Sequence, residues 1–261
     1  NPVNPVNPVD SMLFKDHFSG HATDYARYRP DYPAALYEFL AKAVKRHELA
    51  WDCGTGSGQA ALGLTQYFDR VIATDPSAEQ IQNAVRHEKV SYFVAPAEQT
   101  GIPSHSVNLV TAAQAVHWFD LERFYQEVRR VLKPDGVLAL WCYGLSKINP
   151  AVDKVVQHYY TNIVGPYWPP ERRYIDEKYE TIPFPFAELP TPEFHMKAEW
   201  DLSEFMGYLH TWSATQRFEK KNEQNPLNMV HRLLTKTWGE PQTRQTVRWP
   251  LYLRIGRVTS L

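Results

Sequence analysis

Apolar and polar residues alternate along the first half of the chain in a pattern that predicts strands separated by helices. Short, nearly all-apolar runs typical of buried strands cover 49–53, 71–75, 90–95, 107–112 and 137–142. Apolar residues recur at helical spacing over 32–44, 60–68, 77–87 and 120–132. Strands that alternate with helices imply parallel strands joined by crossovers, and apolar strands suit a sheet covered on both faces. We therefore expect a doubly wound α/β sheet.

The second half of the chain has a different pattern. Seven of the 20 prolines fall between Pro166 and Pro192, and seven of the eight tryptophans lie at or beyond Trp118. Much proline disfavours long regular elements, whereas abundant aromatic residues disfavour disorder. We therefore predict an ordered insertion or lid at about 145–192. After it we expect a strand near 193–201, helices over 202–221 and 226–239, and a last strand over 247–258 that alternates like an antiparallel edge strand.

Composition narrows the class of protein. Hydrophobic residues make up 43% and charged residues 22%, as in ordinary globular proteins. Lys plus Arg total 28 against 29 for Asp plus Glu, so the basic excess of most nucleic-acid-binding proteins is missing. No apolar run approaches the roughly 20 residues of a membrane span. We expect no nucleic-acid or membrane partner and, since no leader pattern opens the sequence, a cytoplasmic location as a monomer or homodimer.

Metal and disulfide chemistry have little support. The two cysteines, Cys53 and Cys142, are too few for a disulfide scaffold and lack metal-ligand spacing. His195, His210 and His231 are widely separated and form no recognisable metal set. No metal site is predicted.

Candidate chemistry begins where the first strand ends. The strand runs into Gly54, Gly56 and Gly58 and then into a helix, an arrangement that lets a ligand approach the backbone closely. The spacing is Gly-x-Gly-x-Gly, not the Gly-x-Gly-x-x-Gly of dinucleotide sites, and Asp52 precedes it. A carboxylate there repels a pyrophosphate but favours an ammonium or sulfonium ligand.

A second acid strengthens this interpretation. Asp75 ends the second strand, 17 residues after Gly58, where a carboxylate can accept hydrogen bonds from both ribose hydroxyls of an adenosine. The alternative is that Asp75 only opens the Asp-Pro-Ser turn. Ser77, followed three residues later by Gln80, predicts a capping box for the next helix.

These motifs resemble the class I S-adenosylmethionine-dependent methyltransferases of the type 11 group, over about 14–145 and more loosely to the end. The motifs are Asp52 to Gly58, the third-strand Ala95-Pro96-Ala97-Glu98, and the turn Leu132 to Leu138. Asn108 stands where the family usually has an acid, a change we expect to be structural. The resemblance implies S-adenosyl-L-methionine as cofactor and S-adenosyl-L-homocysteine as product. The residues implied to bind the cofactor are Tyr25, Arg29, Asp52, Gly54, Thr55, Gly56, Gly58, Asp75, Pro76, Ala97, Glu98 and Gln114.

The resemblance also implies a fold. It is a Rossmann-like, seven-stranded, mostly parallel sheet within one domain over 13–261, with an N-terminal helical cap (13–46) and the inserted lid. Residues 1–12, which contain three Asn-Pro-Val repeats, predict an extended tail outside it.

A narrower resemblance points to small-molecule acceptors. The segments 18–30, 112–119 and 210–213 are similar to a branch that includes the trans-aconitate methyltransferases. His117, after the fourth strand, is expected to orient or deprotonate the acceptor; a carboxylic acid would need only a hydrogen bond. The alternative is a histidine satisfied within its turn. The residues expected to bind the acceptor are Trp118, Tyr143, Trp168, Arg172, Arg173 and Trp212.

Three other functions compete with a small-molecule methyltransferase. A methyltransferase for RNA or protein should have a basic face or an open groove. A non-catalytic protein that binds an adenosine ligand could keep the loop and Asp75 without transferring a methyl. A nicotinamide dehydrogenase is disfavoured by the glycine spacing and by Asp52. The near-neutral charge and the aromatic lid disfavour the first of these. Turnover with a panel of acids, phenols and amines would separate an enzyme for small molecules from the first two.

Overall fold

A computed structural model describes residues 30–258 of the chain, and its centre is one mixed sheet. The order is β3-β2-β1-β4-β5-β8-β6, with β7 also paired to β8. The neighbours from β3 to β5 are parallel, whereas β8 runs antiparallel to β5. The predicted doubly wound α/β sheet is confirmed. The strands are β1 (Leu49–Cys53), β2 (Arg70–Asp75), β3 (Val90–Val94), β4 (Val107–Ala113), β5 (Leu132–Tyr143), β6 (Ala187–Glu188), β7 (Phe194–Trp200) and β8 (Gln245–Arg257).

The strand order reverses between β1 and β4. The chain proceeds from β1 to β2 and β3 on one side, then returns to β4 and β5 on the other. Crossovers leave this point in opposite directions, so a crevice opens at the carboxyl ends of β1 and β4. In doubly wound sheets, ligands bind in that crevice.

The last strand, β8, was predicted to be an edge strand, but it lies inside the sheet between β5 and β6. β5 pairs with residues 251–257 of β8, and Lys147 continues along the same edge opposite Arg248. β7 pairs with 245–251 and β6 with 256–257, so both lie on the other edge. β6 and β7 thus share the outermost position, separated by a segment that contains Pro190 and Pro192.

Helices cover both faces of the sheet because alternate strand residues point to opposite sides. Ala50 and Leu109 pack in a core with α2 and α3, while Trp51 and Val110 pack in a second core with α5. The α-helices of the described region are α2 (Ala34–Ala43), α3 (Gln59–Leu64), α4 (Ala78–Asn83), α5 (Leu121–Val131), α6 (Pro150–His158), α7 (Arg172–Asp176), α8 (Leu202–His210), α9 (Ser213–Asn222) and α10 (His231–Trp238).

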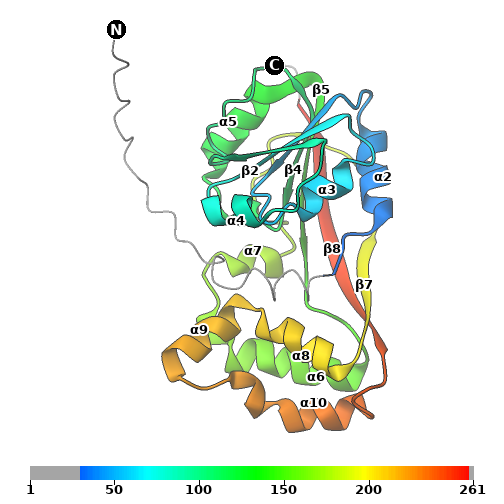
Figure 1. Ribbon diagram of the computed structural model, residues 1–261, viewed down its shortest axis with the longest axis vertical. Coiled ribbons are helices and arrows are strands. Elements are labelled where there is room, and N and C mark those ends of the chain that lie inside the picture. Colours follow the sequence, from blue (N-terminus) through cyan, green and yellow to red (C-terminus); the bar gives the residue numbers. More distant parts are fainter. Residues whose placement is uncertain (1–29, 259–261) are drawn as a thin grey trace.

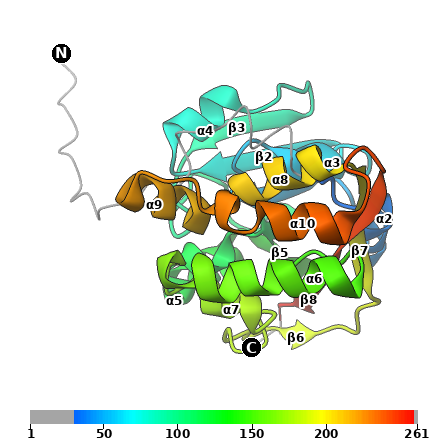
Figure 2. The same cartoon turned by 90° about the horizontal axis from the view of Figure 1, so that it is seen from below.

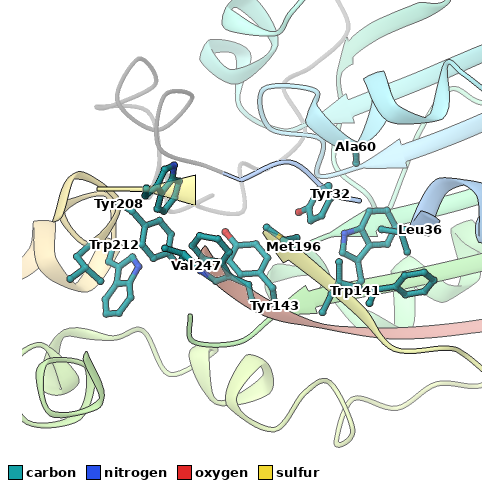
Figure 3. Packing of buried hydrophobic residues seen from close by; sticks show 14 of the residues in the cluster. Tyr32, Leu36, Ala60, Trp141, Tyr143, Met196, Tyr208, Trp212 and Val247 are labelled. Atoms are coloured by element: carbon teal, nitrogen blue, oxygen red, sulfur yellow. Dashed lines mark hydrogen bonds between the residues drawn. The ribbon is translucent and has the colours of Figure 1, made fainter. Parts of the chain in front are cut away.

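Helices α6, α8, α9 and α10 gather beyond the carboxyl end of the parallel strands (Figures 1 and 2). We call this group the helical layer. It is joined to the sheet by one continuous apolar core, in which Tyr143 lies between Trp141 on the sheet side and Trp212 on the helical side (Figure 3). The helical layer therefore stands over the crevice at the switch point.

The predicted lid segment contributes to both the helical layer and the sheet. From β5 the chain enters α6, continues through a π-type turn (η2, Tyr159–Ile163) and a 3₁₀ turn (η3, Gly165–Tyr167), and passes through α7 to β6. The helix expected over 202–221 is two helices, α8 and α9. The one expected over 226–239 is a 3₁₀ turn (η4, Pro226–Met229) followed by α10.

Side chains cap several helices as the sequence suggests. The Ser77 hydroxyl accepts the Gln80 N–H at 3.3 Å, so the predicted N-cap is confirmed. The reciprocal half of the capping box is wrong, because the Ser77 N–H donates to Asp75 instead. A complete capping box, between Asp201 and Glu204, starts α8. Over the described residues, no helix is long and apolar enough to cross a membrane.

Candidate active site

The glycine loop (residues 54–58) connects β1 to α3 in a backbone conformation that favours glycine. Gly54, Gly56 and Gly58 have φ angles of 63°, 55° and 89°. A Cβ on Gly54 would lie 2.5 Å from Ala115 Cβ, and one on Gly58 would lie 2.3 Å from Tyr92 Oη. A Cβ on Gly56 would meet only Gln80 Oε1, at 3.8 Å. The first and third glycines thus serve close packing, whereas the second leaves open space above the backbone.

Asp75 links the end of β2 to this loop. Its Oδ2 accepts the Gly56 N–H and its Oδ1 accepts the Ser77 N–H, both at 2.9 Å. The residue is 8% exposed. Each carboxylate oxygen can accept more than one hydrogen bond, so this geometry fixes the carboxylate and leaves it capacity for ligand hydroxyls.

Asp52 lies beneath the loop and is fully buried. Its carboxylate accepts hydrogen bonds from the hydroxyls of Thr55 at 2.6 Å and Thr111 at 2.8 Å. Burial raises the pKa of Asp52 to about 6, although both hydroxyls oppose the shift. Asp52 therefore ties the loop to β4, and any attraction for a sulfonium acts through the protein and not by contact.

Gln114 follows β4 in a left-handed conformation with φ 54°. Its N–H donates to the Trp141 carbonyl at 2.8 Å, which fixes the turn. Its Oε1 is buried and has no hydrogen-bond partner among the described residues. Strained backbone conformations and buried polar atoms without a partner both occur at ligand sites, so these two features of Gln114 suit a residue that contacts a ligand at the switch point.

The other predicted cofactor residues lie around this loop or outside the described region. Ala97 is buried, and Glu98 Oε1 accepts the Asp120 N–H at 2.9 Å, so Glu98 caps the start of α5. Pro76 follows Asp75 and is half-buried. Tyr25 and Arg29 fall outside the described residues.

Asn108 has the structural role expected of it. Its Oδ1 accepts the Leu49 N–H at 3.0 Å, in the interior of the protein. This hydrogen bond joins the start of β1 to β4.

A cleft lies between the carboxyl end of the sheet and the helical layer. Its empty space is about 740 Å³, open mouth included. We call it the aromatic cleft. It is lined by Gln114, His117, Trp118, Tyr143, Gly144, Leu145, Trp168, Pro169, Arg172, Ile175, Tyr208, Thr211, Trp212 and Ser213. Five of the six residues predicted to bind the acceptor line it together, although they come from four separate segments.

Arg172 is the single charged side chain among the described residues that line the cleft. Its guanidinium lies over the Trp168 ring, and its Nε donates to the Tyr160 hydroxyl at 2.8 Å. The side chain is 18% exposed. Arg173, the sixth predicted residue, is exposed and donates to the Tyr174 hydroxyl at 3.0 Å. The structure therefore brings Arg172 to the cleft and not Arg173.

His117 lies in the 3₁₀ turn η1 (Val116–Trp118) at the boundary of the cleft. Its Nδ1 is 2.7 Å from the hydroxyl oxygen of Tyr179, and both side chains are buried. Burial lowers the pKa of His117 to about 3, and the positive charge of Arg172 adds to this effect. The ring is therefore neutral at physiological pH.

Three tyrosines in or beside the site escaped prediction from the sequence. Tyr208 on α8 lines the cleft four residues before Trp212, and this spacing within the helix expected over 202–221 was a usable signal. Tyr160 faces Trp168 and Arg172, but its position follows from a π-type turn that no pattern indicates. Tyr179 meets His117 across 62 residues and had no signal.

The sheet order, the glycine loop and the acid at the end of β2 define a Rossmann-like fold with a loop suited to an adenosine-containing ligand. Comparison with known proteins identifies the family. The family model described as a methyltransferase domain matches residues 51–140, from β1 into β5. This chain belongs to the class I S-adenosylmethionine-dependent methyltransferases.

The similarity to individual relatives extends across nearly the whole chain. A Dictyostelium discoideum protein named as a methyltransferase is 37% identical over 252 residues, which cover 94% of this chain and 95% of that protein. A solved structure, described as a type II methyltransferase from Anaeromyxobacter dehalogenans, is 45% identical with a TM-score of 0.84, and the match covers 88% of this chain and 98% of that one.

A third relative carries the cofactor in its name. Saccharomyces cerevisiae CRG1, described as an S-adenosylmethionine-dependent methyltransferase, is 36% identical over 146 residues, or 52% of this chain and 49% of that protein. The narrower resemblance to the trans-aconitate branch stays a prediction.

Proposed function

We propose that this chain transfers the methyl group of S-adenosyl-L-methionine to a small-molecule acceptor bound in the aromatic cleft, with a carboxylic acid as the favoured acceptor. The observation that carries the proposal is the placement of Arg172. It is the single charge among the described lining residues of a largely aromatic cleft that begins at the switch point of the sheet. An anionic, partly apolar molecule of small size suits such a lining.

The residues of the glycine loop fit the cofactor. Open space above Gly56, the fixed carboxylate of Asp75 and the unpaired Oε1 of Gln114 supply a close backbone approach, a ribose partner and a polar contact. Around them we assign cofactor contacts to Gly54, Thr55, Gly58, Pro76, Ala97 and Glu98, to the field of Asp52, and, outside the described region, to Tyr25 and Arg29. The cofactor supplies a methyl group bonded to a positively charged sulfur, and a nucleophile can take this methyl group directly.

The protein's part in the reaction is to orient the acceptor and exclude water. We assign acceptor contacts to Trp118, Tyr143, Trp168, Arg172 and Trp212, and a hydrogen bond to His117. Aromatic walls displace water from the nucleophile, and the Arg172 charge fixes a carboxylate with one oxygen toward the methyl group. Positioning of this kind accounts for a large share of the rate in displacement reactions.

The first test is calorimetric titration of the purified protein with S-adenosyl-L-methionine and S-adenosyl-L-homocysteine, with NAD as the control. We expect micromolar binding of both sulfur ligands, lost in Asp75→Ala, and no binding of NAD. A panel of carboxylic acids, phenols and amines then identifies the acceptor class. Tight cofactor binding without turnover on any small molecule would overturn the proposal in favour of a binding protein or a macromolecular methyltransferase.

A further inference from the structure

The hydrogen bond between His117 and Tyr179 can run in either of two directions, and the direction decides what His117 can do in the cleft. A phenol brings one proton and can also accept, whereas a neutral imidazole has one N–H nitrogen and one acceptor nitrogen. If Nδ1–H donates, Nε2 carries a lone pair and can act as a base. If the Tyr179 hydroxyl donates to Nδ1, Nε2 carries the proton and can only donate.

The surroundings of Tyr179 select the second arrangement. Its side chain has no exposed surface, and within the described part of the chain Nδ1 of His117 is the one hydrogen-bond partner of its hydroxyl. If Nδ1–H donated, the phenol proton would be buried without an acceptor, which is unfavourable. When the phenol donates, the proton and Nδ1 satisfy each other. Burial also raises the pKa of Tyr179, so the phenol keeps its proton.

Tyr179 is held in place from the backbone. Lys178 and Tyr179 both adopt left-handed conformations, with φ angles of 57° and 62°. Arg254 on β8 donates to the carbonyls of Tyr179 at 3.0 Å and Ile182 at 2.5 Å. Such conformations persist where the surroundings over-determine them, and they cluster at functional sites. The ring is thereby aimed at His117 across 62 residues of sequence.

We infer that Tyr179 is a positioning residue that holds His117 as the Nε2–H tautomer, so that His117 donates a hydrogen bond to an acceptor carboxylate and does not remove a proton from it. The inference rests on the proposed function, which supplies the acceptor. Nε2 forms no hydrogen bond with any described residue, and the ring lines the aromatic cleft beside Arg172. Arg172 and His117 can thus both donate to an anion in the cleft. None of the described lining residues is a carboxylate that could serve as a base.

A carboxylate is the acceptor that needs no base. One oxygen forms a bond to the methyl carbon while the carbon–sulfur bond breaks, and the electron pair of that bond stays on sulfur. The negative charge of the acceptor and the positive charge of the sulfonium disappear together, and no proton moves. Alcohols and amines must lose a proton during or after transfer, so we expect them to be poor acceptors here.

The kinetic test compares His117→Gln with His117→Ala. Glutamine can donate a hydrogen bond from its amide but cannot take up a proton, so it separates a donor from a base. With a carboxylate acceptor we expect His117→Gln to keep kcat within about tenfold of wild type and His117→Ala to lose about 100-fold. If His117→Gln is as impaired as His117→Ala, the donor role is overturned.

Tyr179→Phe tests the positioning role. It removes the group that fixes the tautomer, and we expect kcat to fall by at least about tenfold with little change in KM. Tyr125→Phe is the matched control, because Tyr125 also donates from a packed site, to the Pro183 carbonyl at 2.5 Å, but, unlike Tyr179, forms no hydrogen bond with His117. We expect Tyr125→Phe to leave kcat unchanged. Equal losses in the two variants would indicate a merely structural effect and overturn the inference.

A readout independent of turnover separates this inference from the proposed function. ¹⁵N NMR of the histidine rings, with the His117 signals assigned by their loss in His117→Gln, reports which nitrogen carries the proton. We expect the proton on Nε2 in wild type and a mixture of tautomers in Tyr179→Phe. A proton on Nδ1 in wild type would overturn the inference even if methyl transfer is observed. If Tyr179→Phe does not fold, the wild-type spectrum and the Gln–Ala comparison still decide.

Discussion

The guanidinium carbon of Arg172 lies 4.4 Å from the centre of the Trp168 ring, at the wall of the aromatic cleft. The centre of the Tyr160 ring is 5.2 Å from the same carbon. The nearest carboxylate, Asp176, is 3.6 Å from Nε and about half exposed, so solvent screens it. Aromatic faces stabilise a cation without neutralising it, so the charge of Arg172 remains available to an anionic ligand.

We predict that Arg172→Met raises KM for a carboxylate acceptor by about 10- to 100-fold, because a hydrogen bond to a charged group contributes about 1.5–3 kcal/mol. Methionine keeps much of the side-chain length and apolar packing while removing the charge. Affinity for S-adenosyl-L-methionine should stay within about twofold of wild type. Steady-state kinetics, with calorimetry of cofactor binding alongside, measures both effects.

Arg173→Met is the comparison for that variant. Arg173 is adjacent in sequence but exposed, and it does not line the cleft. We expect its KM to stay near the wild-type value. An increase as large as that of Arg172→Met would show that the acceptor contacts the outer surface of α7, contrary to the assignment above.

We predict that His117 makes the protein less stable as the pH falls below about 6.5. Its pKa is about 3 in the folded protein, against 6.5 for the unperturbed group. Between these values the unfolded chain binds a proton that the folded protein does not, so folding loses stability as the pH falls toward 3. His117→Gln removes this dependence. Urea unfolding at pH 7.5 and pH 5 should show a smaller loss for His117→Gln than for wild type, and identical losses would contradict the lowered pKa.

Thr111→Val should destabilise the protein more at pH 8 than at pH 5. Thr111 is one of two hydroxyls that donate to the buried Asp52 carboxylate. Without it the ionised carboxylate loses a donor, at a cost of about 1–3 kcal/mol. The raised pKa of about 6 means that Asp52 is ionised at pH 8 and largely protonated at pH 5, where this loss is smaller. Chemical denaturation at the two pH values measures the difference, and an equal loss at both would show that Asp52 does not change its ionisation state between them, contrary to a pKa of about 6.

The sheet and the loop were predictable from the sequence because their signals are local. The strand predicted over 49–53 coincides with β1, since an apolar run ends there at the glycine loop. The helix predicted to end near His87 instead ends at Asn83. The Val85 N–H donates to the Ser57 carbonyl of the glycine loop, and this tertiary contact, which local patterns do not show, turns the chain away.

The helical layer and the details of the site depend on long-range contacts. The predicted 202–221 helix is interrupted near Trp212, although no glycine or proline stands there. Trp212 places its ring against Tyr160, Trp168 and Tyr208, and the Gln216 side chain donates to the carbonyl of His210. The aromatic content indicated a binding wall, whereas the partner of His117 follows only from how α7 and the turn after it pack against η1.

Two glycines of the loop separate folding from cofactor binding. Gly56 and Gly54 have similar left-handed φ angles, so an alanine at either position costs about 1–2 kcal/mol of conformational strain. A Cβ at Gly54 would also overlap Ala115 Cβ at 2.5 Å, whereas a Cβ at Gly56 has no neighbour nearer than 3.8 Å. Overpacking of this kind adds about 1–3 kcal/mol. Gly54→Ala should therefore be clearly less stable than Gly56→Ala in urea unfolding.

For the cofactor affinity of the folded protein, we expect Gly56→Ala to be the more damaging of the two variants. The Cβ of Gly56→Ala would fill the space in which we place the cofactor, so we predict that it weakens S-adenosyl-L-methionine binding at least about tenfold while the protein remains folded. Calorimetry of Gly56→Ala, after its fold has been checked by circular dichroism, tests this directly. Wild-type affinity in Gly56→Ala would mean that the cofactor does not pass over this glycine. In that case the open space above Gly56 would reflect only the turn between β1 and α3, and Asp75 would have to hold the ribose from another side of the loop.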